Sequence, residues 1–124
     1  MARILVIDDD PQLRSLLRRC FERRNHEVIE ASDGNMGLEV YRSEGADVII
    51  TDLIMPGKEG METIMELRRD FPDSKIIAIS GGGRVAPQSY LQLAKGIGAS
   101  RAFSKPFDLD QILAAVEELA GEKP

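Results

Sequence analysis

The chain has 124 residues, an ordinary globular composition and a formal net charge of −5 at pH 7. This length suits one domain with one hydrophobic core, and the negative charge argues against general nucleic-acid binding. The single cysteine, Cys20, cannot form an internal disulfide, which fits a reducing, cytoplasmic compartment, and no apolar run approaches the roughly 20 residues of a membrane span.

The first predicted strand, residues 3–8, is almost continuously apolar and leads into three consecutive aspartates. The stretch after it predicts a helix, because its apolar residues recur at helical spacing. Pro11 suits the first turn of this helix and Asp10 its N-cap. We expect one stripe of this helix to face the core: Leu13, Leu16, Leu17, Cys20 and Phe21.

Further strand-like runs follow in alternation with helix-like stretches. The strands are predicted at residues 27–31, 47–51, 75–80 and 100–104, and the helices at 35–44, 61–70 and 85–97. His26 stands in a polar turn before the second strand, so we expect it to be solvated. Met61 and Met65 are expected in the core on the third helix.

The last predicted helix begins after Asp108, which with Gln111 resembles a capping box. Its apolar stripe is Leu109, Ile112, Leu113, Val116 and Leu119. Five strand–helix units of this kind predict a doubly wound α/β domain with a parallel sheet and helices on both faces. The sequence contains no linker or repeat, so we expect a single domain over residues 1–124.

Polar side chains collect where the predicted strands end. Asp8, Asp9 and Asp10 follow strand one, Asp52 follows strand three, Ser80 ends strand four, and Lys105 and Pro106 follow strand five. Ligands of open parallel sheets bind at this edge. If strands one and three are neighbours, the crowded carboxylates raise each other's pKa, and a hard cation such as Mg²⁺ relieves the repulsion. With no histidine or cysteine nearby, zinc is disfavoured.

This ordered set resembles the receiver domain of two-component response regulators, of the stand-alone chemotaxis type. The resemblance rests on the acidic pair after "ILVI", the aspartate in "DVIITDLIMPG", the serine ending "IIAIS", and "KPF". It covers essentially the whole chain. It implies a flavodoxin-like fold with strand order 2-1-3-4-5 and no output domain.

The resemblance also implies a role for each site residue. Asp52 would accept a phosphoryl group from a sensor histidine kinase or a histidine phosphotransfer protein. The ligands of Mg²⁺ would be Asp8, Asp9, Asp52 and the main-chain carbonyl of Ile54. Lys105 would pair with phosphate oxygens and Ser80 would bind the phosphoryl group once formed. The Lys105–Pro106 peptide would be cis. Phosphorylation would switch a protein-binding surface, with or without dimerisation, or the group would be passed on.

Three features depart from the family pattern. Ala102 stands where the family has an aromatic or large residue that moves on phosphorylation, and Phe103 is expected on the opposite face of the sheet. Neither Ile54 nor Gly82 can orient an attacking water, so we expect slow self-dephosphorylation. The loop after Ser80 is long and rich in glycine.

Two basic residues of the first helix, Arg14 and Arg18, have two interpretations. In the family this helix docks on the kinase, which favours a docking role for both. Arg18 and Glu22 are also spaced for an i,i+4 ion pair on a solvated face.

Two alternatives to a complete receiver remain. Asp8 and Asp10 have the spacing of haloacid-dehalogenase-like phosphatases, although Gln12 does not fit that pattern and Asp52 would be unexplained. The chain could also be the receiver fragment of a longer transcriptional regulator. On the receiver interpretation no turnover of small molecules is expected.

Overall fold

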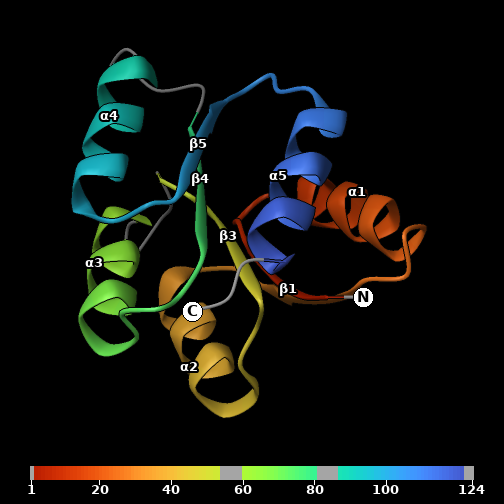
Figure 1. Cartoon of the computed structure of the whole chain (residues 1–124), viewed down its shortest axis with the longest axis horizontal. Coiled ribbons are helices and arrows are strands. Elements are labelled where there is room, and N and C mark those ends of the chain that lie inside the picture. Colours follow the sequence, from red (N-terminus) through yellow and green to blue (C-terminus); the bar gives the residue numbers. More distant parts are fainter. Residues whose placement is uncertain (1, 54–59, 81–86, 122–124) are drawn as a thin grey trace.

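The computed structural model describes the backbone of residues 2–53, 60–80 and 87–121, and the side chains of the same residues except 87–91. Five strands alternate with five helices in this part of the chain (Figure 1). The strands are β1 (Arg3–Ile7), β2 (Glu27–Ala31), β3 (Val48–Asp52), β4 (Ile76–Ser80) and β5 (Arg101–Ser104). The helices are α1 (Pro11–Glu22), α2 (Gly34–Glu44), α3 (Gly60–Asp70), α4 (Pro87–Ile97) and α5 (Leu109–Gly121).

The five strands form one parallel sheet in the order β2-β1-β3-β4-β5, which confirms the predicted fold. Helices α1 and α5 cover one face, while α2, α3 and α4 cover the other (Figure 1). Each face has its own buried apolar cluster, because alternate residues of the central strands point to opposite sides. Phe103 packs on the α1/α5 side and Ala102 on the other, as predicted from their adjacent positions.

The start of α1 follows the predicted capping chemistry, whereas the start of α5 departs from the predicted capping box. Asp10 is the N-cap of α1, where its side chain accepts a hydrogen bond from the Gln12 N–H, and Pro11 occupies the first turn. Asp108 accepts from the Asp110 N–H, one position earlier than in a capping box. The third strand lies one residue later than predicted, so Asp52 is its last residue.

Two apolar side chains predicted in the core are exposed. Leu16 is 37% exposed, because α1 turns Leu17 and Phe21 to the sheet and Leu16 lies at the edge of that stripe. Met65 is 56% exposed. The buried face of α3 carries Ile64 and Leu67, and a residue next to Ile64 is rotated away from it by the helical period.

The prediction of a solvated His26 is wrong. The side chain is only 7% exposed. Its Nδ1 accepts a hydrogen bond from the Ala2 N–H (3.0 Å), and its Nε2 lies 3.3 Å from Glu117 of α5. The ring also contacts Phe21 edge-on. His26 therefore ties the start of β1 to α1 and α5.

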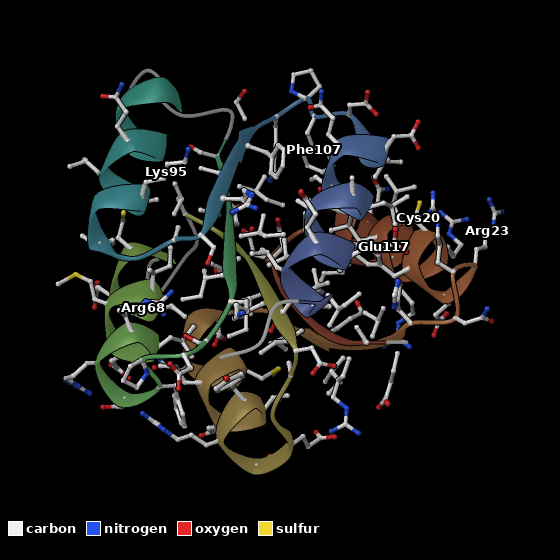
Figure 2. All side chains as sticks on the ribbon, viewed as in Figure 1. Cys20, Arg23, Arg68, Lys95, Phe107 and Glu117 are labelled. Atoms are coloured by element: carbon white, nitrogen blue, oxygen red, sulfur yellow. The ribbon has the colours of Figure 1, made fainter. Side chains whose placement is uncertain are left out.

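Arg68 joins the ends of two helices on the other face (Figure 2). Its guanidinium donates to the main-chain carbonyls of Pro72 and Gly98, which follow α3 and α4. Gly98 has φ +129°, and a Cβ there would lie 2.8 Å from Nε of Arg68. This contact fixes where the chain turns from α4 into β5. No helix in the described ranges has the length and apolar character that crossing a membrane requires.

Candidate functional site

The sheet register brings the predicted acidic residues together. Ile7 of β1 pairs with Thr51 of β3. The residues that follow them, Asp8 and Asp52, therefore lie side by side at the carboxyl edge of the sheet. Together with Asp9, they can place one carboxylate oxygen each within 4.8 Å of one another. Asp8 and Asp52 are buried and Asp9 is exposed, so the cluster opens to solvent on one side.

Asp52 is held by the close approach of α3. Its main-chain carbonyl accepts a hydrogen bond from the buried hydroxyl of Thr51 (3.1 Å), and the next residue, Leu53, donates its N–H to Ile79 of β4 (2.9 Å). Gly60, the first residue of α3, lies directly against this backbone. A Cβ at Gly60 would lie 1.9 Å from the Asp52 carbonyl oxygen. Only glycine fits here without a shift of the strand end.

Lys105 supplies the positive charge of the cluster. Its Nζ lies 3.4 Å from Oδ2 of Asp8 and 3.4 Å from Oδ2 of Asp52. Burial alone would lower the pKa of this ammonium, but the carboxylates of Asp52 and Asp8 outweigh that effect and raise it. The lysine therefore stays charged. The Lys105–Pro106 peptide is cis, as predicted.

Asp8 is held through both its carboxylate and its main chain. Its Oδ1 accepts a hydrogen bond from the Asp10 N–H (2.8 Å) and its own N–H donates to the carbonyl of Ala31 (3.1 Å). Burial raises the pKa of the Asp8 carboxyl to about 6. The Asp10 N–H lowers it, the Asp52 charge raises it further, and Lys105 lowers it. A divalent cation bound to the carboxylates would offset the cost of burying the charge of Asp8.

Ser80 lies at the end of β4 and is buried. Its main-chain carbonyl accepts the Lys105 N–H (2.7 Å), so serine and lysine stand at adjacent strand ends. The predicted carbonyl ligand of Ile54, the position of Gly82 and the glycine-rich loop at 81–86 lie outside the described residues.

The cluster fits Mg²⁺ by the chemistry of its donors. Three carboxylates converge, one of them with a raised pKa, and hard oxygen ligands are what Mg²⁺ prefers. Asp10 is not a member of this group within the described residues, because its carboxylate caps α1. That arrangement disfavours the phosphatase interpretation, which needs Asp8 and Asp10 to act together.

Sequence reasoning missed two contributors to the site, Gly60 and Glu30. Glu30 of β2 binds Arg14 and Arg18, the two arginines with a possible docking role. Its Oε1 accepts from Arg14 Nε (3.0 Å) and its Oε2 from Arg18 Nε (2.7 Å). The predicted Arg18–Glu22 pair is also present, at 3.4 Å. A polar residue inside the apolar run of β2 was the one signal that could have identified Glu30.

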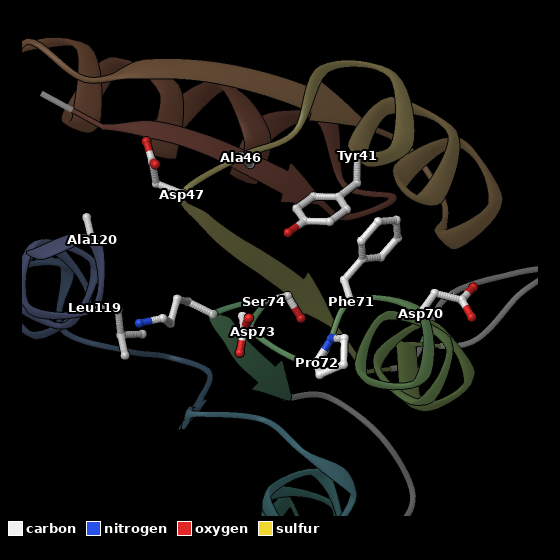
Figure 3. A pocket seen from close by; sticks show the side chains of 11 residues that line it. Tyr41, Ala46, Asp47, Asp70, Phe71, Pro72, Asp73, Ser74, Leu119 and Ala120 are labelled. Atoms are coloured by element: carbon white, nitrogen blue, oxygen red, sulfur yellow. The ribbon is translucent and has the colours of Figure 1, made fainter. Parts of the chain in front are cut away.

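A cleft of about 420 Å³ lies at the opposite edge of the sheet (Figure 3). Tyr41 and Phe71 meet there edge to face, with ring centroids 4.8 Å apart. Two of its carboxylates are already bound, because Asp47 accepts the Arg3 N–H and Asp70 accepts from Arg42. The cleft lies at the amino ends of the strands, so it takes no part in the acidic cluster.

Comparison with known proteins shows which family this chain resembles. The sequence model described as response regulator receiver domain matches residues 4–117. Protein PilH of Pseudomonas aeruginosa is 32% identical over 124 residues, covering 98% of this chain and 100% of PilH. Sporulation initiation phosphotransferase F of Bacillus subtilis is 28% identical, covering 94% of this chain and 91% of that protein. Several other relatives are about twice as long, and the chain covers 46–49% of them.

Solved structures agree with the fold. Response regulator protein TrrA from Thermotoga maritima, in complex with Mg(2+)-BeF, superposes with a TM-score of 0.84 at 31% identity. The match covers 96% of this chain and 99% of that one.

Proposed function

This chain belongs to the response regulator receiver domains, and on that premise we propose that Asp52 accepts a phosphoryl group from a phosphohistidine of a sensor histidine kinase or a histidine phosphotransfer protein. One observation carries the proposal: the ammonium of Lys105 lies 3.4 Å from both Asp8 and Asp52, at the mouth of a three-carboxylate cluster. The nucleophile and the groups that neutralise charge therefore lie together at one edge of the sheet, where the cluster is open to solvent.

The transfer needs only groups at this edge and the donor. A carboxylate oxygen of Asp52 attacks the phosphorus, and the new O–P bond forms as the P–N bond to the donor imidazole breaks. The electron pair stays on the imidazole nitrogen, which takes up a proton. Lys105 pairs with oxygens of the transferring group, and Ser80 donates its hydroxyl to one of them once the acyl phosphate exists.

Asp8, Asp9, Asp52 and the main-chain carbonyl of Ile54 would hold Mg²⁺ in this proposal. A bound Mg²⁺ would offset the negative charge of the transferring group. The support is the donor set itself, together with the Mg(2+)-BeF complex of the similar protein TrrA.

The output is a change at the surface near the site. A phosphoryl group adds about −1.5 to −2 charge beside Ser80 and Lys105. This local charge shifts the equilibrium between two conformations of the nearby surface. Because Ala102 replaces the family's large residue, no aromatic side chain at this position carries the change. The signal then leaves by protein binding or by onward transfer to a histidine.

Intact-mass measurement after incubation with Mg²⁺ and acetyl phosphate tests the proposal. We expect a phosphoryl adduct on the wild-type chain and none on Asp52→Asn or in the presence of EDTA. If acetyl phosphate and a phosphorylated histidine phosphotransfer protein both gave no adduct, the proposal would be wrong. An adduct that survived Asp52→Asn would point to Asp8, and hydrolysis of p-nitrophenyl phosphate that is lost in Asp8→Asn would then establish a phosphatase.

A further inference from the structure

A half-buried arginine, Arg14, connects helix α1 to the turn that carries the acidic pair. The Nη1 atom of Arg14 donates to the main-chain carbonyl of Asp8 at 2.6 Å. Its Nε donates to Oε1 of Glu30 at 3.0 Å, and the side chain is only 18% exposed. One rigid guanidinium thus joins α1, β2 and the end of β1.

The carbonyl that Arg14 holds belongs to the peptide between Asp8 and Asp9. Its orientation sets the direction in which the chain leaves β1, and therefore where the exposed Asp9 carboxylate points. The Asp8 N–H and Oδ1 are fixed by Ala31 and Asp10, so the carbonyl is the remaining main-chain group that could turn. Glu30 lies opposite Val6 in the sheet, close enough to the turn to orient the guanidinium.

We infer that Arg14 is a positioning residue for the cation site: it fixes the Asp8–Asp9 peptide so that both carboxylates face Asp52, and Glu30 orients it. The inference rests on the proposed function, because it assumes that the cluster binds Mg²⁺. It assigns Arg14 an intramolecular task in place of docking. Groups that orient metal ligands from outside commonly change metal affinity by about 10-fold or more when they are removed.

Arg18 provides a matched control. It binds the other oxygen of the same Glu30 and carries the same charge, but its other partner within the described part of the chain is Glu22 on the helix surface. It is also more exposed, at 38%. A general effect of charge or of the Glu30 network would therefore act through Arg18 as well as Arg14, whereas positioning of the Asp8 carbonyl acts through Arg14 alone.

The test is a Mg²⁺ titration of the unphosphorylated chain followed by amide NMR shifts, which also report whether each variant is folded. We expect Arg14→Gln to weaken Mg²⁺ binding about 10-fold and Arg18→Gln to change it less than about twofold. The sign is diagnostic. Removing a positive charge near the cluster would by itself strengthen Mg²⁺ binding, so weaker binding cannot be an effect of charge.

Equal or tighter binding by Arg14→Gln would overturn the inference, as would equal losses in Arg14→Gln and Arg18→Gln. If Arg14→Gln does not fold, Arg14→Lys takes its place, because an ammonium keeps the charge but not the fork that spans Asp8 and Glu30. Wild-type affinity in Arg14→Lys would then overturn the inference. A wild-type chain that bound no Mg²⁺ would overturn the metal site of the proposed function as well, so the two failures are distinguishable.

Discussion

The Nζ atom of Lys105 lies 3.4 Å from Oδ2 of Asp52, and it is equally close to Asp8. The ammonium therefore stands against the carboxylates that a cation would join. A charge in this place has two opposite effects: it repels a divalent cation and attracts the oxygens of a phosphoryl group.

Lys105→Met should separate these two effects. We expect Mg²⁺ to bind severalfold more tightly, because a competing cation is gone, while phosphorylation by acetyl phosphate slows by at least about tenfold, since loss of one stabilising group at a reacting oxygen has costs of this order or larger. Lys95→Met, on the exposed side of α4, is the control and should change neither quantity. Loss of Mg²⁺ binding in Lys105→Met would contradict this account.

Gly60→Ala should damage the site through the backbone. The new Cβ would lie 1.9 Å from the Asp52 carbonyl and 2.6 Å from Cα of Leu53, and main-chain atoms cannot move aside as a flexible side chain can. We expect a loss of about 1–3 kcal/mol in the free energy of unfolding by urea. The rate of phosphorylation should fall as well, because Asp52 would be displaced.

Gly96→Ala is the matched control for Gly60→Ala. Gly96 lies within α4 and nothing would meet its Cβ within 4 Å. Alanine there should raise the free energy of unfolding by about 0.5–1 kcal/mol, because glycine is the poorer helix former. If both variants lost stability equally, the close approach of α3 to Asp52 would not be the cause.

The parts of the site that the sequence predicted depend on strand ends alone. The carboxyl ends of parallel strands lie at one edge of the sheet, so Asp8, Asp52 and Lys105 could be placed at the same edge once the strands were recognised. The alternation of apolar runs and amphipathic stretches was sufficient to predict the fold class. The strand order came from the resemblance and not from the pattern.

Two of the wrong predictions concern how a helix is rotated on the sheet. Leu16 and Met65 belong to plausible apolar stripes, and only the rotation of α1 and α3 decides which edge of a stripe is exposed. His26 and Glu30 are polar, so their positions in the sequence predict solvent. His26 is buried against Ala2 and Glu30 is half-buried against Arg14. The partner of His26 lies 24 residues away in the sequence, so no local pattern reveals it, whereas the polar position of Glu30 within an apolar strand was a signal.

His26→Ala should destabilise the fold without changing phosphorylation. It would leave the N–H of the buried Ala2 without its acceptor and remove the edge contact with Phe21. We expect a loss of about 1–3 kcal/mol in thermal or urea unfolding, the usual consequence of an unpaired buried donor. Glu117→Gln should cost less than about 1 kcal/mol, because Glu117 is 39% exposed and its ion pairs lie at the surface. A solvated His26 would instead give a His26→Ala variant as stable as the wild type.

Asp8 makes the stability of the metal-free chain depend on pH. Burial raises the pKa of its carboxyl from 3.8 to about 6, so between these values the folded chain keeps a proton that the unfolded chain has released. Stability falls with rising pH wherever the folded state holds more protons. Because one pKa unit corresponds to about 1.4 kcal/mol, the loss amounts to about 3 kcal/mol and is complete above about pH 6.

Asp8→Asn removes this titration. In EDTA, its free energy of unfolding should exceed that of the wild type by about 3 kcal/mol near neutral pH, and the advantage should shrink by about 1–2 kcal/mol on going to about pH 5. Asp9→Asn is the control, since Asp9 is exposed and its carboxylate keeps its water. Urea denaturation of the three proteins measures all of these differences. If Asp8→Asn were no more stable than the wild type near neutral pH, the buried carboxylate would not be the strained member of the cluster, and Mg²⁺ would have no such penalty to relieve.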